Sequence, residues 1–278
     1  SSAGDIISGG SGDDHIRGGA GADTLSGGTG DADVLDYTTS TAGVSVNLSS
    51  GLASDGFGGG DDISGFERVF GSAHNDTING SANGNQTKEL FKGLAGNDII
   101  NGNTGFDEID HSGDAGAGGS AGISANLSTG QVTDGFGNTD TVSGIESVVG
   151  TNSSDSFVGQ STFNRFAGLG GNDSFTGGAS EDELNYSFDS ANGGSAGVTV
   201  NLATGTATDG FGNTDTFSSM EMIRGTNSAD VMTGGGNNDF ERFRGLGGAD
   251  TFTGTAAGFQ EIDYSHDHDF GGGAGVTV

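Results

Sequence analysis

Aspartate recurs in this chain at the sixth place of a nine-residue unit, with an apolar residue at the eighth. Gly9–Arg17 reads GGSGDDHIR and runs directly into Gly18–Ser26, which reads GGAGADTLS. The glycine-rich part can turn tightly because glycine adopts backbone conformations that other residues avoid. The last three residues can form a short strand whose middle side chain points inward. Carboxylates and turn carbonyls at this spacing supply only oxygen ligands, which suit a hard cation such as Ca²⁺.

The unit is repeated along most of the chain. Further regular copies begin at Gly71, Gly93, Gly102, Gly150, Gly159, Gly168, Gly177, Gly225 and Gly245. Less obvious copies read GFGGGDDIS from Gly56, GFGNTDTVS from Gly135 and GFGNTDTFS from Gly210. A dozen copies in register do not arise by chance, even in a chain with 59 glycines among 278 residues.

This G-G-x-G-x-D-x-U-x unit resembles the RTX calcium-binding repeats of secreted bacterial proteins. The resemblance implies that one nonapeptide forms half a circuit of a flattened coil, so that loops 18 residues apart stack on the same side. We therefore predict an all-β fold, a parallel β-roll or β-solenoid with Ca²⁺ ions stacked between the Gly-rich turns.

The predicted metal ligands are the side chains at the sixth place of each copy. They are Asp5, Asp14, Asp23, Asp33, Asp61, Asp76, Asp98, Asp107, Asp140, Asp155, Asn164, Asp173, Asp182, Asp215, Asp230 and Asp250. Backbone carbonyls are expected from Gly10, Gly12, Gly19, Gly21, Gly28, Gly96, Gly105, Gly168, Gly171, Gly178, Gly245 and Gly248. The alternative is that these side chains only cap turns by accepting hydrogen bonds from local amides.

The two-loop geometry predicts which ligands share an ion. The expected pairs are Asp5 with Asp23, Asp14 with Asp33, Asp76 with Asp98, Asp155 with Asp173, Asn164 with Asp182, and Asp230 with Asp250. Asn164 would offer an amide oxygen with less charge, and Gln260 replaces the aspartate of the last site.

Two further groups of residues leave alternatives open. Asp55, Asp134 and Asp209 precede the GFG turns, where they could add a second carboxylate or serve the turn alone. The run from His266 to Asp269 could chelate a transition metal or belong to a solvated loop.

The composition indicates a cation requirement. The formal charge of −30 opposes compaction, and about ten Ca²⁺ ions would reduce it to about −10. Such acidity argues against nucleic acid and anionic membranes as partners, because both require basic patches. The core would hold one inward side chain per rung, which cannot offset the backbone entropy of so much glycine. Metal binding and folding should therefore be one process.

A second period of about 75–79 residues overlies the first. GVSVNL from Gly43, GISANL from Gly122 and GVTVNL from Gly197 mark three units. We divide the chain into an amino-terminal nonapeptide block (1–36), superrepeats 1, 2 and 3 (37–110, 111–185 and 186–263) and the start of a fourth (264–278). One continuous solenoid with wider coils at these marker segments is expected, and separate small β-rolls joined by sandwich-like linkers are the alternative.

The expected role is non-enzymatic. The chain has no Cys, its five His do not recur at equivalent places, and no G-x-S-x-G elbow precedes a helix. Weak Ca²⁺ sites, of roughly 10⁻⁴–10⁻³ M, fill outside the cell, so we expect a secreted or surface location by the type I route. No apolar run is long enough for a membrane helix.

Both ends interrupt a repeat, so we expect a segment of a larger protein that self-associates or continues with more repeats. An S-layer, a fibre or an adhesin stalk is the preferred context. The calcium module of a secreted RTX protease, lipase or polysaccharide epimerase is the alternative, and ice binding is a minor one.

Overall fold

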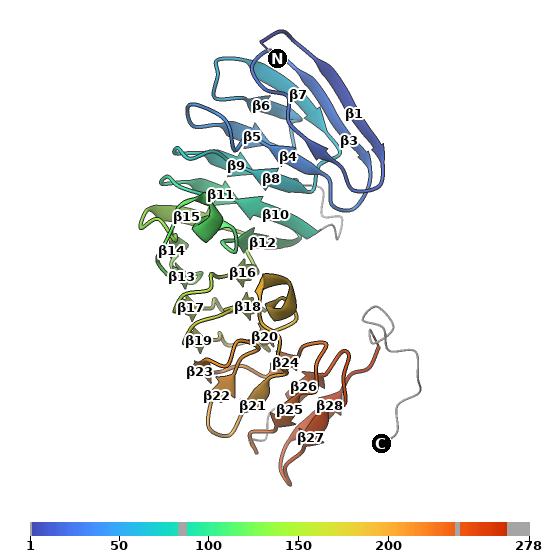
Figure 1. The fold of residues 1–278 in the computed structure, drawn as a ribbon, viewed down its shortest axis with the longest axis vertical. Helices are drawn as coiled ribbons and strands as arrows, with labels where there is room; N and C mark the ends of the chain where they lie inside the picture. Colours follow the sequence, from blue (N-terminus) through green and yellow to red (C-terminus); the bar gives the residue numbers. More distant parts are fainter. Residues whose placement is uncertain (1, 83–87, 237–239, 266–278) are drawn as a thin grey trace. The chain divides into compact units, whose positions relative to one another are not determined.

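The computed structural model describes residues 2–82, 88–236 and 240–265, and almost all of its regular structure is β-strand (Figure 1). It divides into two compact units: residues 1–121 with 129–148, and residues 122–128 with those from 149 onward. Within the described ranges the only helices are α1 (Asp114–Ala117) and the 3₁₀ turn η1 (Asp189–Asn192). Among these residues no helix has the length and apolar character needed to cross a membrane.

Unit 1 contains two sheets of short strands. The first sheet holds β1 (Ile6–Ser11), β3 (Thr24–Thr29), β5 (Ser45–Asn47), β6 (Leu52–Ser54), β7 (Gly60–Ser64), β9 (Thr77–Asn79), β11 (Ile99–Asn101), β14 (Gln131–Thr133) and β15 (Thr139–Ser143). The second holds β2 (His15–Ile16), β4 (Val34–Asp36), β8 (Arg68–Phe70), β10 (Lys88–Lys92) and β12 (Phe106–Asp110), all parallel.

Unit 2 repeats this plan. Its first sheet holds β13 (Ser124–Asn126), β17 (Ser156–Val158), β19 (Ser174–Thr176), β21 (Thr199–Asn201), β22 (Thr206–Thr208), β23 (Thr214–Ser218), β25 (Val231–Thr233) and β27 (Thr251–Thr253). Its second sheet holds β18 (Arg165–Ala167), β20 (Glu183–Asn185), β24 (Met222–Arg224), β26 (Phe240–Arg244) and β28 (Phe259–Ile262). Strand β16 (Ser147–Val149) contains the boundary between the units.

The register confirms the predicted coil of two nonapeptides. Ile7 pairs with Leu25, and Phe157 with Phe175, each partner 18 residues further along the chain. The middle residue of each three-residue strand points inward, and the Phe157 and Phe175 rings stack with centroids 4.8 Å apart. The predicted parallel β-roll is therefore confirmed, with a core of about one side chain per rung.

The marker segments widen the coil, as expected from their alternating pattern. Strand β5 forms an antiparallel hairpin with β6, β6 pairs antiparallel with β7, and β5 then continues parallel to β9. Strands β21, β22 and β23 repeat this arrangement in unit 2. The marker segments therefore supply extra strands to the first sheet without interrupting the stacking of the rungs.

Candidate calcium-binding carboxylate columns

The sixth-place side chains, together with five glutamates and Gln260, form two columns, one at the turns entering each sheet. In unit 1 the first column is Asp5, Asp23, Asp61, Asp76, Asp98 and Asp140, and in unit 2 it is Asp155, Asp173, Asp215, Asp230 and Asp250. The second column is Asp14, Asp33, Glu67, Glu89, Asp107 and Glu146 in unit 1, and Asn164, Asp182, Glu221, Glu241 and Gln260 in unit 2.

Each column is held together by backbone-to-carboxylate hydrogen bonds. The N–H of one residue donates to the Oδ1 atom of its partner on the next rung, as Asp155 does to Asp173 over 2.8 Å. The other five expected pairs make the same bond at 2.7–3.0 Å. The structure thus brings all six predicted pairs together, while their role as metal ligands stays a prediction.

Glycine at the first place of each loop makes room for the carboxylate. A Cβ atom on Gly93 would lie 2.3 Å from Asp98 Oδ2, and one on Gly168 would lie 2.1 Å from Asp173 Oδ2. The fourth-place Gly171 has a φ of +131°, and a Cβ there would lie 2.6 Å from the Ser153 carbonyl oxygen of the preceding rung. The motif therefore keeps glycine where the carboxylate folds back and where the rungs touch.

Many column carboxylates have an oxygen with no partner among the described residues. Asp14, Asp23, Asp33, Asp98, Asp107 and Asp173 each bury an unpaired Oδ2 atom. Burial, with Asp140 and Asp76 nearby, raises the pKa of Asp98 to about 8. Burial raises the pKa of Asp173 to about 9, with Asp155 and Asp215 adding to the effect. Orphaned carboxylate oxygens of this kind fit a bound cation, which would restore a partner to each.

Other column carboxylates support the turn-capping alternative instead. Where a hydroxyl residue follows the first glycine, its N–H donates to the aspartate, as Thr151 does to Asp155 Oδ2 over 2.7 Å. The Thr151 hydroxyl also donates to Oδ1 of the same residue. Ser72 with Asp76 and Thr226 with Asp230 repeat this pattern. The loops of Asp23, Asp98 and Asp173 have no hydroxyl residue at this place, and they leave the Oδ2 atom open.

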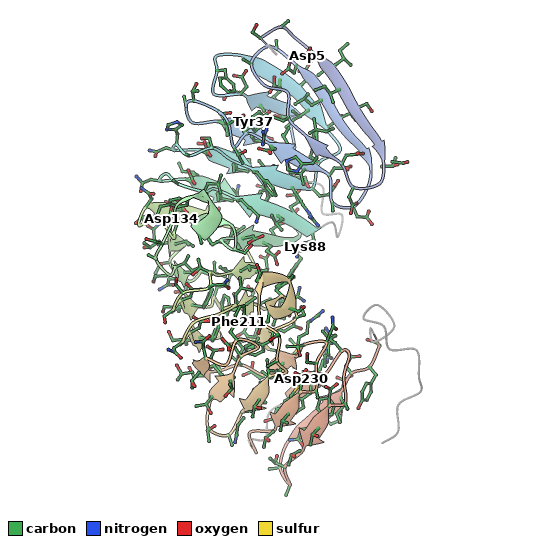
Figure 2. All side chains as sticks on the ribbon, in the orientation of Figure 1. Asp5, Tyr37, Lys88, Asp134, Phe211 and Asp230 are labelled. Carbon is green, nitrogen blue, oxygen red and sulfur yellow. The ribbon has the colours of Figure 1, made fainter. Side chains whose placement is uncertain are left out.

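The GFG copies have a different partner. Tyr37, labelled in Figure 2, donates its hydroxyl to Asp61 Oδ2 over 2.9 Å, and Tyr186 donates to Asp215 Oδ2 over 3.1 Å. Burial, followed by the charge of Asp61, raises the pKa of Tyr37 well above its usual value, so it stays a donor. In superrepeat 2 the buried His111 stands at the corresponding position, but its Nδ1 atom contacts Asp114 over 3.1 Å and its Nε2 atom has no hydrogen-bond partner among the described residues. The two hydroxyl hydrogen bonds explain the tyrosine of the D-x-L-x-Y landmark, whose role the sequence reasoning missed.

The second column includes glutamates that the sequence reasoning also missed. Asp33, Asp107 and Asp182 donate their N–H groups to Glu67, Glu146 and Glu221, respectively, over 3.0–3.1 Å. The signal was present, because SGFE, SGIE and SSME place an acid at the same point of each superrepeat. Glu89 and Glu241 follow longer insertions and stand in register with Asp107 and Gln260.

Asn164 departs from the aspartate pattern. Its Nδ2 atom donates to Asp182 Oδ1 over 2.8 Å and to the Thr162 carbonyl, while its Oδ1 accepts from the Gln160 N–H. The amide nitrogen, rather than the oxygen, faces the partner rung. The role of Asn164 as an oxygen ligand stays a prediction, and it requires the amide group to turn over.

Side chains alone do not complete a metal cage. Among the described residues no three acidic or imidazole side chains converge at ligand spacing. Main-chain carbonyls would have to complete each shell, and the glycine carbonyls predicted for this purpose lie in the turns but remain predictions. The run from His266 to Asp269 lies outside the described residues.

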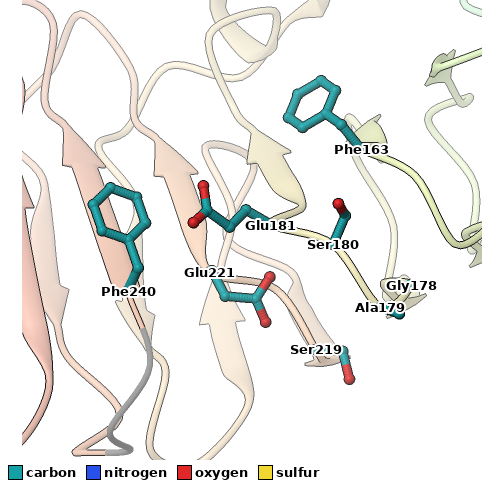
Figure 3. Close-up of a pocket in the computed structure, with 8 residues that line it drawn as sticks. All are labelled: Phe163, Gly178, Ala179, Ser180, Glu181, Ser219, Glu221 and Phe240. Carbon is teal, nitrogen blue, oxygen red and sulfur yellow. The ribbon is translucent and has the colours of Figure 1, made fainter.

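A polar groove opens beside the second column of unit 2. It encloses about 740 Å³, and Figure 3 shows Glu181 and Glu221 between Phe163 and Phe240. Ser180 and Ser219 also line it. The groove therefore places one further carboxylate, that of Glu181, beside the column.

The fold is a parallel β-roll. Its short strands lie in two sheets, and the Gly-rich turns between them bury carboxylates in register, as expected for calcium-binding turns. The family model of the RTX calcium-binding nonapeptide repeat matches in four copies, at residues 1–33, 83–116, 158–190 and 215–240. The chain is therefore a calcium-binding repeat module of the RTX type. The comparison with curated proteins found no match.

Proposed function

We propose that this module is a non-enzymatic, calcium-dependent structural segment of a large exported bacterial surface or extracellular protein. S-layers, fibres and adhesin stalks are the contexts that fit. The unpaired buried oxygens of the carboxylate columns carry the proposal, because a cation from solution would supply the partners that the chain does not. Ca²⁺ at the concentrations found outside cells would then drive folding after export.

The charge distribution supports a structural role over nucleic-acid binding. Most of the eight basic side chains make ion pairs with carboxylates in or beside the second sheet, such as Lys92 with Asp110 over 2.8 Å. Arg165, Arg224 and Arg244 all approach Glu183. Basic groups engaged in this way form no free patch for phosphate.

Repetition supports self-association or continuation by further repeats. Each superrepeat rebuilds the same rungs, and stacked rungs present strand edges that another repeat can cover. Electron microscopy of the purified chain in millimolar Ca²⁺ tests the proposal and should show filaments, lattices or end-to-end assemblies that chelator disperses. Strictly single particles that hydrolyse a glycan or peptide would contradict it and favour the module of an RTX enzyme.

A further inference from the structure

Superrepeat 3 buries two carboxylates that lie outside the nine-residue frame. Asp189 begins the η1 turn and Asp209 begins the DGFG turn, and both are at most 1% exposed. The N–H of Gly210 donates to Asp189 Oδ2 over 2.9 Å, so the two turns touch. A Cβ on Gly210 would lie 2.8 Å from that oxygen and 3.2 Å from the Ala196 carbonyl oxygen. These turns therefore gather oxygen atoms at one place, beside Phe211 in Figure 2.

Both carboxylates have an oxygen without a partner. Asp209 Oδ1 accepts the N–H groups of Phe211 and Asn213 over 2.9 and 2.7 Å, but its Oδ2 accepts none. Asp189 Oδ1 is likewise unpaired. Burial raises the pKa of Asp189 to about 8, and its strongest charged neighbours include Asp209 and Asp215. Two buried carboxylates that lie close together, each with an oxygen atom that accepts no hydrogen bond, need a positive charge or a proton to offset the cost of burial.

Superrepeat 1 has the same two turns, but their oxygen atoms have hydrogen-bond partners within the chain. Ser40 stands three residues after Tyr37, as Asp189 stands after Tyr186, and its hydroxyl donates to the Asp55 carbonyl over 2.6 Å. Asp55, the counterpart of Asp209, has its Oδ2 satisfied by the Gly21 N–H over 3.2 Å. The open oxygen is therefore a property of particular superrepeats and not of the DGFG turn itself.

The cause is one residue in the turn. Asn213 replaces Gly59 of superrepeat 1, and its Oδ1 accepts the Gly171 N–H over 3.2 Å. That amide is the counterpart of the one that satisfies Asp55. Because the Gly171 N–H donates to Asn213, it is not available to the Oδ2 atom of Asp209.

Superrepeat 2 supplies a basic group of its own at the equivalent place. Asp114, the counterpart of Asp189, contacts His111 Nδ1 over 3.1 Å. Superrepeat 3 has Tyr186 where superrepeat 2 has His111, and a phenol offers no positive charge. Superrepeat 3 therefore combines the extra carboxylate with the neutral neighbour.

We propose that Asp189 and Asp209 of superrepeat 3 hold a hard divalent cation, Ca²⁺ above all, at a site separate from the nonapeptide columns. Asp189 Oδ1 and Asp209 Oδ2 are the side-chain ligands. Main-chain carbonyls such as that of Ala196, together with water, complete an all-oxygen shell. The ion fixes the η1 turn against the DGFG turn. This inference extends the proposed function, because it adds an ion that the nonapeptide count leaves out.

The test is the number of Ca²⁺ ions bound per chain, measured by equilibrium dialysis with elemental analysis at saturating Ca²⁺. Asp189→Ser, which copies Ser40, should bind one ion fewer than the unmodified chain. Asp189→Asn keeps the size of the side chain and should show the same loss, which covers the case in which the serine variant does not fold. Asp62→Ser removes an equal charge from an exposed strand position and should leave the count unchanged.

The outcomes separate this inference from the proposed function. If both Asp189 variants fold and keep the full count, Asp189 and Asp209 share protons rather than a cation, and the site is overturned. If the unmodified chain binds no Ca²⁺ at all, the proposed function fails as well. A loss of one ion in both variants, with the control unchanged, establishes the site.

Discussion

Carboxylates occur in two settings in each unit, and their partners differ. On the outer face of the second sheet they meet basic groups: Asp110 pairs with Lys92, and Asp263 pairs with Arg244 over 2.7 Å. Hydrogen bonds and these charges outweigh burial and lower the pKa of both carboxyls. In the turn columns, Asp98 and Asp173 meet other carboxylates, and burial raises their pKa values.

The contrast shows where the chain provides its own cations. All eight Lys and Arg residues lie in the second sheet or directly beside it. The outward positions of the first-sheet strands carry mostly neutral residues, either Ser, Thr and Asn or exposed apolar residues such as Ile99 and Val231, and Asp62 is their one charged residue in the described part of the chain. The columns therefore depend on a cation from solution, whereas the outer face of the second sheet does not.

Removal of calcium should have the largest effect. In excess chelator at neutral pH the buried column carboxylates must either stay charged or take up protons, and both oppose folding, so we expect circular dichroism to change from β structure to coil. Millimolar Ca²⁺ should restore the β spectrum, and Mg²⁺ should restore little, because it prefers small octahedral cages and retains its waters. The same β spectrum in chelator and in Ca²⁺ would show that the column carboxylates do not need a cation from solution, and it would contradict the contrast with the outer face of the second sheet.

The repeat spacing was sufficient to predict the β-roll, the 18-residue register and all six carboxylate pairs. Each of these depends on local geometry that every copy repeats. At Gly93, for example, the missing Cβ atom leaves room for the Asp98 carboxylate. The partners of Asp61 and Asp215 could not be predicted, because Tyr37 and Tyr186 reach them across the fold. The second-column glutamates were missed because they break the nine-residue spacing. Glu67, Glu146 and Glu221 lie six residues after the preceding sixth-place aspartate, and the other two follow insertions.

Acid should partly replace calcium. Burial gives Asp98, Asp173, Asp189 and Asp215 folded-state pKa values of about 8, 9, 8 and 7, above the ordinary value near 4. A carboxyl whose pKa is higher in the folded state than in the unfolded state stabilises the fold when it is protonated. This stabilisation is complete below the pKa of the unfolded state and is lost as the pH rises through the pKa of the folded state. The calcium-free chain should therefore gain β structure as the pH falls from 8 to about 5.

The control is the same acid titration in saturating Ca²⁺. Cations favour the ionised carboxylates, so stability there should fall with acid instead of rising. Parallel pH dependence in both conditions, followed by circular dichroism and chemical unfolding, would show that the column carboxylates do not exchange protons for cations.

A smaller, local effect is expected from Asp173→Ala. The change removes the unpaired oxygen and the acceptor of the Asp155 N–H, so one shared site should be lost and nearby affinity should fall on the order of tenfold. Calorimetric titration with Ca²⁺ measures both. Asp62→Ala removes the same charge from the first sheet's outer face and is the matched control. Unchanged stoichiometry and midpoint in Asp173→Ala would contradict the pairing of these two loops.

Changes on the outer face of the second sheet should have effects that do not depend on calcium. Glu183 is 3% exposed and accepts from Arg165 and Arg224, with Arg244 3.6 Å away. Glu183→Gln leaves partly buried guanidinium groups without their counter-charge, so the free energy of unfolding should fall by about 1–3 kcal/mol.

Lys88→Ala is the matched surface change for this comparison. Lys88 pairs with Glu108 over 2.9 Å but is 42% exposed, and Glu108 keeps a hydrogen bond from the Ser147 hydroxyl. Its loss should lower the free energy of unfolding by less than about 1 kcal/mol. Chemical unfolding of both variants at two saturating Ca²⁺ concentrations provides the measurement, and the number of ions bound should stay at the unmodified value. Loss of a bound ion in Glu183→Gln, like the loss expected for Asp173→Ala, would contradict this prediction. It would mean that the ion-pair network holds the columns in their binding geometry and that the two carboxylate settings are coupled.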